Sequence, residues 1–208
     1  TRYQIVDNWI ADTQNIALKA DRYARNNIYD SYGNIVIENL PTNLPYMVLT
    51  GSMLPQYKGN EIKIDGEFTD PVHPNKSFKF IDGDIDVQGT SSAGYARKNY
   101  LLKLTNGINQ NGVMREDYQM RNDSIATDVF CFKADVASSE GCNNVELVRL
   151  YDKACPYRTP PQQINPLVRQ GIDGFPMVIF HNDGDKTTFI GKYNFNNDKS
   201  TNEVFGLD

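Results

Sequence analysis

Residues 76–104 read KSFKFIDGDIDVQGTSSAGYARKNYLLKL, and this stretch decides the fold class. Apolar side chains such as Phe78, Phe80 and Val87 alternate with polar ones, which is the two-residue period of a half-buried strand. A Gly-Thr-Ser-Ser turn follows, and then a second strand-like run, NYLLKL, at 99–104. The stretch therefore predicts two antiparallel strands joined by a turn, with one face in the core and the other in solvent.

Strand-like runs continue on both sides of this stretch. They are IVIENL (35–40), YMVLTG (46–51), NEIKIDGEF (60–68), DVFCFKAD (128–135) and the hairpin GFPMVIFHNDGDKTTFIGKYNFN (174–196), whose turn is Asn-Asp-Gly-Asp. Apolar residues recur at helical spacing in 6–27 and 140–155. The sequence thus predicts an α+β fold, with a helical arm at 1–34 and an antiparallel β-rich domain at 35–208 that carries one or two packed helices.

Charge and composition exclude several classes of protein. The 208 residues carry a net charge of −5, so a basic face for nucleic acid or acidic membrane is not expected. No run of 18 apolar residues occurs, so no membrane span is expected. No C-x-x-C pair occurs among the three cysteines, and neither histidine lies near a cysteine or the other histidine in the sequence. This spacing argues against a structural zinc site. A start at Thr1 rather than Met leads us to expect that the chain belongs to a longer parent protein.

The turn between the two central strands is the best candidate for a binding site. Its residues are Gly89, Thr90, Ser91 and Ser92, and the cations Arg97, Lys98 and Lys103 follow. Backbone amides and hydroxyls beside two or three cations suit a phosphate group. The alternative is an ordinary tight turn whose cations are solvated. A metal site at Asp82, Asp84 and Asp86 is less favoured than a solvated strand face, because the EF-hand pattern fails at Val87 and Ala93.

The spacing of three blocks resembles the CotH family, the spore-coat-type kinase-like proteins. The first block is GTSSAGYARKNYLLKL, the second is FKADVASSEGCNNVEL and the third is FPMVIFHNDGDKTTFIGKYNF. Residues that match the family pattern are Gly89, Ser91, Ser92, Lys98, Tyr100, Lys133, Ala134, Asp135, Asn144, Gly191 and Tyr193. Departures include Thr90 for Asn, Arg97 for Lys, Val136 for Tyr and Asn197 for Glu.

The resemblance implies a kinase-like small lobe that binds ATP and Mg²⁺. In that interpretation Gly89–Ser92 cover the phosphates and Lys98 or Lys103 pairs with them. Asp135 and Asn144 would brace the helix that follows. The catalytic base and the metal-binding carboxylate of such a kinase belong to a larger C-terminal lobe. The chain ends before such a lobe, so we do not expect it to be a complete kinase or an active enzyme as given.

Phrases such as GFPMVIF and GKYNFNNDKSTNEVFG also resemble a divergent CotH-like branch in bacteriophage virion proteins. The first functional hypothesis is therefore a structural or interaction module of a virion, in the tail or host-contact apparatus. Its expected partners are other virion subunits, or the rest of a longer parent chain, in an oligomeric assembly. Its expected location is the virion, with a bacterial extracellular or spore surface as the alternative. Two other functions stay open: an atypical protein kinase that lacks its catalytic lobe, and a carbohydrate- or peptide-binding β-domain.

Overall fold

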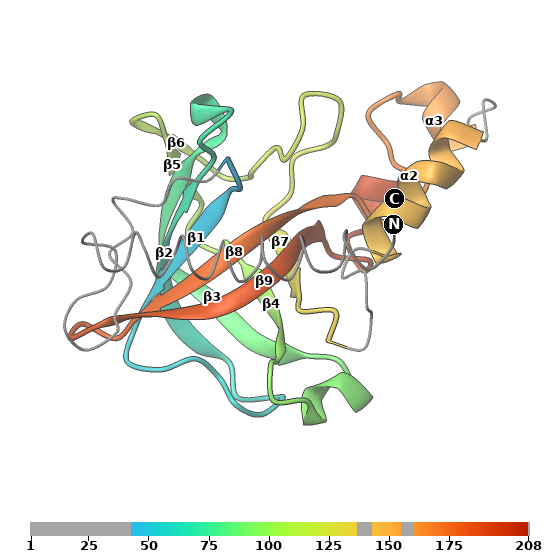
Figure 1. Ribbon diagram of the computed structural model, residues 1–208. Helices are drawn as coiled ribbons and strands as arrows, with labels where there is room; N and C mark the ends of the chain where they lie inside the picture. Colours follow the sequence, from blue (N-terminus) through green and yellow to red (C-terminus); the bar gives the residue numbers. More distant parts are fainter. Residues whose placement is uncertain (1–42, 137–142, 155–159, 208) are drawn as a thin grey trace, which may run out of the picture.

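Seven strands form a closed β-barrel in the computed structural model, which describes residues 43–136, 143–154 and 160–207 (Figure 1). The barrel strands are β1 (Tyr46–Thr50), β2 (Ile62–Thr69), β3 (Phe78–Gln88), β4 (Asn99–Lys103), β7 (Val129–Lys133), β8 (Gly174–Asn182) and β9 (Thr187–Asn197). The order around the barrel is β2-β1-β8-β9-β7-β4-β3, and β3 pairs with β2 to close it. Closure leaves no free edge among these seven strands.

Local pairings agree with the sequence prediction, and distant pairings complete the barrel. The consecutive strands β2, β3 and β4 pair antiparallel, and β8 and β9 form the predicted hairpin. The pairing that the sequence did not indicate is parallel and joins β1 to β8, with Tyr46 opposite Val178. A short hairpin of β5 (Ile108–Gln110) and β6 (Val113–Arg115) continues outward from β3.

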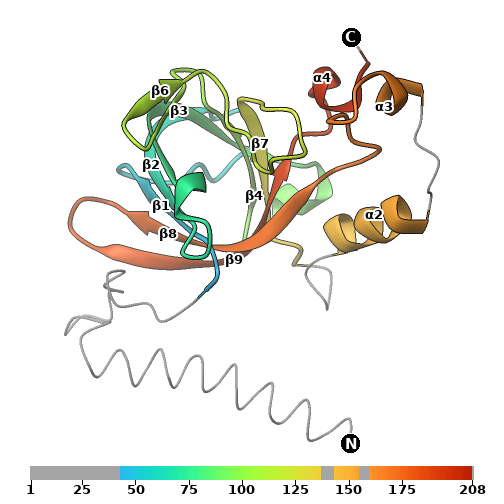
Figure 2. The same ribbon diagram turned by 90° about the horizontal axis from the view of Figure 1, so that it is seen from above.

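The predicted α+β, kinase-like small lobe is wrong. In an α+β domain a helix covers one face of an open sheet, but here the sheet closes on itself and buries its own inner face. The α-helices of the described residues are α2 (Asn143–Ala154), α3 (Pro160–Ile164) and α4 (Asn202–Phe205), and they gather to one side of the barrel (Figure 2). Single-turn 3₁₀ helices, η3 (Pro74–Lys76) and η4 (Ser91–Gly94), lie in loops. The predicted helical arm at 1–34 and the predicted strand at 35–40 lie outside the described residues.

Helix α2 is amphipathic and has a narrow apolar face. Val145 is buried and Val148 is half-buried, whereas Leu147 and Tyr151 are exposed. Arg149 of this helix donates a hydrogen bond to the carbonyl of Gly174 at the start of β8. None of the helices in the described ranges is long and apolar enough to cross a membrane.

Aromatic side chains fill the barrel. The ring of Phe195 on β9 lies at the centre, with five other rings at centroid distances between 4.9 and 6.0 Å. These rings belong to Phe68, Tyr118, Phe130, Phe132 and Phe175. Full burial of each large apolar side chain contributes about 1.5–3 kcal/mol to the free energy of unfolding. The strands β2, β7, β8 and β9 are therefore held around one shared aromatic core.

Two glycines make room for another core ring. A Cβ atom at Gly66 would lie 2.4 Å from Cε1 and Cζ of Phe80, and one at Gly83 would lie 2.8 Å from Cε2 of the same ring. Both glycines face the barrel interior, on the neighbouring strands β2 and β3. The Phe80 ring therefore occupies the space that two side chains would otherwise fill.

We predict that Gly66→Ala lowers the free energy of unfolding by about 1–3 kcal/mol, because the added methyl overlaps the buried Phe80 ring. Urea unfolding followed by circular dichroism measures the change. Gly94→Ala is the matched control, because a Cβ there has no atom within 4 Å. Gly66→Ala combined with Phe80→Leu should recover part of the loss. Equal stability of Gly66→Ala and Gly94→Ala would contradict this account of the core.

Candidate functional site

The central turn has a fixed shape that depends on glycine. It follows β3, passes through η4 and leads into β4. Gly89 has φ +108°, and a Cβ there would lie 2.1 Å from the Ser92 hydroxyl. The amide of Asn99 donates to that hydroxyl over 3.1 Å, and its oxygen accepts from the Ala134 backbone N–H over 2.7 Å. The Asn99 side chain thus links the turn by hydrogen bonds to the segment that follows β7.

The structure brings some of the predicted site residues together and separates others. Gly89 and Thr90 line one pocket, whereas Lys98 lines another. Lys103 points elsewhere and forms a 2.7 Å ion pair with Glu61. Lys98 nevertheless lies beside the turn, because its ammonium donates to the Ala93 carbonyl of η4 over 2.8 Å. Of the two predicted phosphate-pairing lysines, only Lys103 lies away from the turn.

The remaining predicted site residues lie in the turn, just after β7 and in α2. Ser91 and Ser92 form the first half of η4. Asp135 has φ +48° and accepts a hydrogen bond from the amide of Asn194. Asn144 lies in the first turn of α2, and its side chain is outside what the structure describes.

The first pocket, which we call the polar pocket, has a volume of about 260 Å³ beside Gly89 and Thr90. Its cations are Lys58, Lys133 and Lys199, which come from three separate segments. The ammonium of Lys133 donates to the side-chain oxygen of Gln88 from β3. Sequence analysis identified the glycine turn and Lys133 but did not indicate that Lys58 and Lys199 lie beside them.

A buried network of Cys131 and Asp198 lies in the wall of the polar pocket. The thiol of Cys131 donates to a carboxylate oxygen of Asp198 over 3.2 Å and accepts from the Gln88 amide over 2.8 Å. Burial raises the pKa of Cys131 to about 12, and the Asp198 carboxylate adds to the shift. Cys131 is 2% exposed, and a thiol with this pKa is not a nucleophile at neutral pH.

Asp198 is held in its ionised form. Burial alone would raise the pKa of Asp198, but hydrogen bonds from Ser200, Cys131 and the Lys199 and Ser200 backbone amides lower it below its usual range. The Lys199 amide contributes a bond of 2.9 Å. The same pocket wall includes Asn196, which is 1% exposed and whose amide nitrogen and oxygen have no hydrogen-bond partner.

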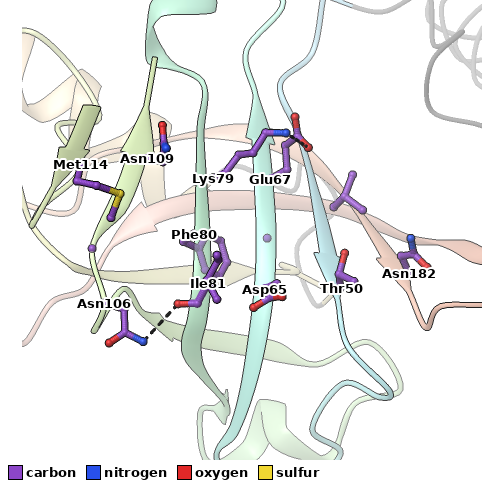
Figure 3. Close-up of a pocket in the computed structure, with 13 residues that line it drawn as sticks. Thr50, Asp65, Glu67, Lys79, Phe80, Ile81, Asn106, Asn109, Met114 and Asn182 are labelled. Atoms are coloured by element: carbon purple, nitrogen blue, oxygen red, sulfur yellow. Dashed lines mark hydrogen bonds and ion pairs between the residues drawn. The ribbon is translucent and has the colours of Figure 1, made fainter. Parts of the chain in front are cut away.

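A third surface feature, which we call the outer groove, runs across the outside of β1, β2 and β3 beside the β5–β6 hairpin (Figure 3). Its volume is about 540 Å³, and it is open to solvent. Its apolar lining residues are Val48, Ile81 and Met114. The side chains of Ile81 and Met114 are 66% and 65% exposed. The ion pair of Lys79 with Glu67, 3.0 Å long, lies across the strands within it (Figure 3).

Polar side chains, three of them asparagine amides, lie on both sides of the outer groove. Asn106 and Asn109 lie on the side of the β5–β6 hairpin, and Thr50 and Asn182 lie on the opposite side (Figure 3). Each Asn amide carries donors and an acceptor, so these walls can bond either backbone N–H or C=O groups. Sequence analysis missed this groove, because its residues come from five separate segments that only the barrel brings together.

The three aspartates of the DGDID run do not share a metal site. Asp84 pairs with Lys63 over 2.6 Å, and both carboxylate oxygens of Asp86 accept from the Gly59 backbone N–H. Asp82 has φ +54° and lies at an irregular point of the pairing with β2. Within residues 43–136, 143–154 and 160–207, no three His, Cys, Asp or Glu side chains are close enough to hold a metal ion.

Comparison with known proteins adds no family: no protein-family model matches the chain, and the curated proteins contain no match. The resemblance to the CotH family stays a prediction from the three sequence blocks.

We predict that Asp198→Asn lowers the free energy of unfolding at neutral pH by about 1–3 kcal/mol, because it disrupts a buried, charge-assisted set of hydrogen bonds. The pKa of Asp198 is lower in the folded chain than the value of about 3.9 typical of an unfolded one. The ionised Asp198 carboxylate therefore stabilises the folded state fully at any pH above the unfolded pKa. This stabilisation is lost as the pH falls through the lower pKa that Asp198 has in the folded chain. Urea unfolding from neutral to acidic pH should show the wild type and the variant converging, and a constant difference would contradict the assignment.

We predict that Cys131 resists alkylation in the folded protein at neutral pH. A pKa of about 12 leaves a thiolate fraction roughly a thousandfold below that of a free cysteine. Iodoacetamide labelling followed by peptide mass spectrometry reads Cys131 separately from Cys142 and Cys155. The same protein in guanidinium chloride is the control and should label fully. Equal labelling rates for Cys131 in the two conditions would rule out the buried thiol.

Proposed function

We propose that this chain is a binding module of a multi-subunit assembly, and that the assembly is a bacteriophage virion, in its tail or host-contact apparatus. The observation that carries the proposal is the outer groove, which lies open beside a short strand. The virion setting rests on the resemblance of the GFPMVIF and GKYNFNNDKSTNEVFG phrases. The kinase hypothesis is abandoned because it required a kinase-like lobe, and the closed barrel is a different fold.

The chemistry of the outer groove favours an extended polypeptide segment of a neighbouring subunit. Val48, Ile81 and Met114 offer apolar contact to alternate side chains of such a segment. The asparagine walls offer partners for its backbone groups. Among the described residues β6 pairs only with β5, so its outer edge can accept a further strand.

A carbohydrate is a poorer fit to the same surface. Sugar rings are commonly recognised by exposed aromatic faces, and the described aromatic side chains with large exposure are Tyr57, Tyr95, Tyr151 and Phe189. None of the four lines the outer groove. The abundant aromatic residues of the sequence are used mainly to fill the barrel.

The proposal is tested in purified particles of the virus that encodes the chain, with quantitative mass spectrometry of each subunit. We expect the wild-type chain in the particles, and we expect Ile81→Asp with Met114→Asp to lower its incorporation by about tenfold or more. A buried carboxylate without a partner opposes docking of an apolar segment.

The matched control is Ile164→Asp, because Ile164 is 88% exposed and lies on α3, outside the outer groove. Its incorporation should equal that of the wild type. Absence of the wild-type chain from the particles would refute the virion assignment. Wild-type incorporation of the groove variant, with the chain present, would refute the groove as the contact surface.

A further inference from the structure

A separate pocket lies at the end of the barrel where β1 and β8 end and β4 begins. We call it the barrel-end pocket; its volume is about 520 Å³. Its three basic side chains are Arg97, Lys98 and His181, and no Asp or Glu is among its lining residues. The whole chain has a net charge of −5, so this concentration of cations does not follow from a generally basic surface.

The two strongest cations of the barrel-end pocket have no carboxylate partner among the described residues. Arg97 donates to the Ala134 carbonyl over 2.8 Å, and Lys98 donates to the Ala93 carbonyl over 2.8 Å. A lysine ammonium has three donors and a guanidinium has five, so both retain capacity for a further acceptor. The Arg97 Nε atom is buried without a hydrogen-bond partner.

Three other lysines of the barrel do have carboxylate partners. Lys63, Lys79 and Lys103 each form an ion pair with a carboxylate, at distances of 2.6, 3.0 and 2.7 Å. Those three pairs lie on the outer face of β2, β3 and β4. Neutralisation by a neighbouring acid is thus common on the barrel, and the barrel-end pocket departs from it.

A buried hydroxyl without a partner also lines this pocket. Tyr193 is 0% exposed, and its hydroxyl has no hydrogen bond. The guanidinium of Arg97 lies over the Tyr193 ring, 5.8 Å from its centroid, and the Tyr100 ring lies 6.2 Å from it. Burial raises the pKa of both phenols, to about 12 for Tyr100, so they stay protonated donors at neutral pH. A buried donor without an acceptor is unfavourable, and a bound anion would satisfy it.

Apolar side chains also line the pocket, namely Met53, Leu54 and Ile190, beside the polar side chains of Ser52 and Gln56. A lining that combines cations and an unsatisfied donor with apolar side chains suits a ligand with both characters. We propose that the barrel-end pocket binds a small organic anion, a carboxylate or phosphate group carried on an apolar body. Arg97, Lys98 and the Tyr193 hydroxyl bind the anionic oxygens, and Met53, Leu54 and Ile190 contact the apolar body.

The test uses the full chain and three anionic probes: phenyl phosphate, benzoate and inorganic phosphate. Calorimetric titration gives Kd, and ¹H–¹⁵N spectra locate the binding through the amides of Leu54, Arg97 and Ile190. We expect saturable binding of phenyl phosphate or benzoate, tighter than that of inorganic phosphate. The tighter of the two organic probes identifies phosphate or carboxylate as the preferred group. Benzyl alcohol, which has the apolar body without the charge, should bind more weakly than either.

Variants assign the contacts. Lys98→Gln keeps a donor for the Ala93 carbonyl and should weaken binding by about tenfold, as expected for loss of one charge-assisted hydrogen bond. Tyr193→Phe keeps the ring under Arg97 and should weaken binding several-fold. Lys103→Gln is the matched control and should leave Kd unchanged, because that ammonium pairs with Glu61 outside the pocket. Thermal melts establish that each variant is folded.

Three results would overturn the proposal. The first is no saturable binding of either organic anion at millimolar concentration. The second is equal binding of benzyl alcohol and the anions. The third is an affinity that Lys98→Gln and Tyr193→Phe leave unchanged in folded protein. None of these results bears on the outer groove, which shares no lining residue with the barrel-end pocket.

Discussion

The packing of aromatic rings around Phe195 is the constraint on which the rest of the structure depends. Five rings surround it, and they come from β2, β7, β8 and the segment before β7. These aromatic side chains exclude water from one shared interior only if the strands that carry them close into a barrel. Phe80 completes the packing because Gly66 and Gly83 leave space for it. The barrel is thus the shape that buries this set of side chains.

A barrel filled in this way places its binding capacity on the outside and at the ends. Inward side chains are committed to packing, so the alternate, outward side chains form the outer groove across β1, β2 and β3. The barrel-end pocket forms where the buried residues Tyr100 and Tyr193 lie beside the segments 52–56 and 96–98. The polar pocket forms beside the Gly89 turn, where Asp198 and Lys133 approach it. Each of these surfaces is assembled from several segments of the chain.

The elements themselves were largely predictable, since they depend on local patterns. The alternation in 62–69 and 78–88 gave two strands, and the Asn-Asp-Gly-Asp turn gave the β8–β9 hairpin. The predicted fold class was wrong because the strand and helix patterns, and then the resemblance over three short blocks, implied an open sheet. The long-range parallel pairing of β1 with β8 instead completes a closed one. Periodicity reports which face of a strand is buried; it does not report whether the buried face packs against a helix or against the opposite wall of a barrel.

The sequence by itself determined the seven barrel strands, the glycine turn at Gly89 and the basic pair that follows it. Only the tertiary structure decided which of those residues meet. Arg97 and Lys98 are neighbours of Gly89 in the chain, yet they line a pocket with Tyr193 and His181. Gly89 instead faces Lys133 and Lys199. The physical reason is that side-chain direction and hydrogen-bonding partners are local properties, whereas neighbours across a barrel are set by which strands pair to enclose the core.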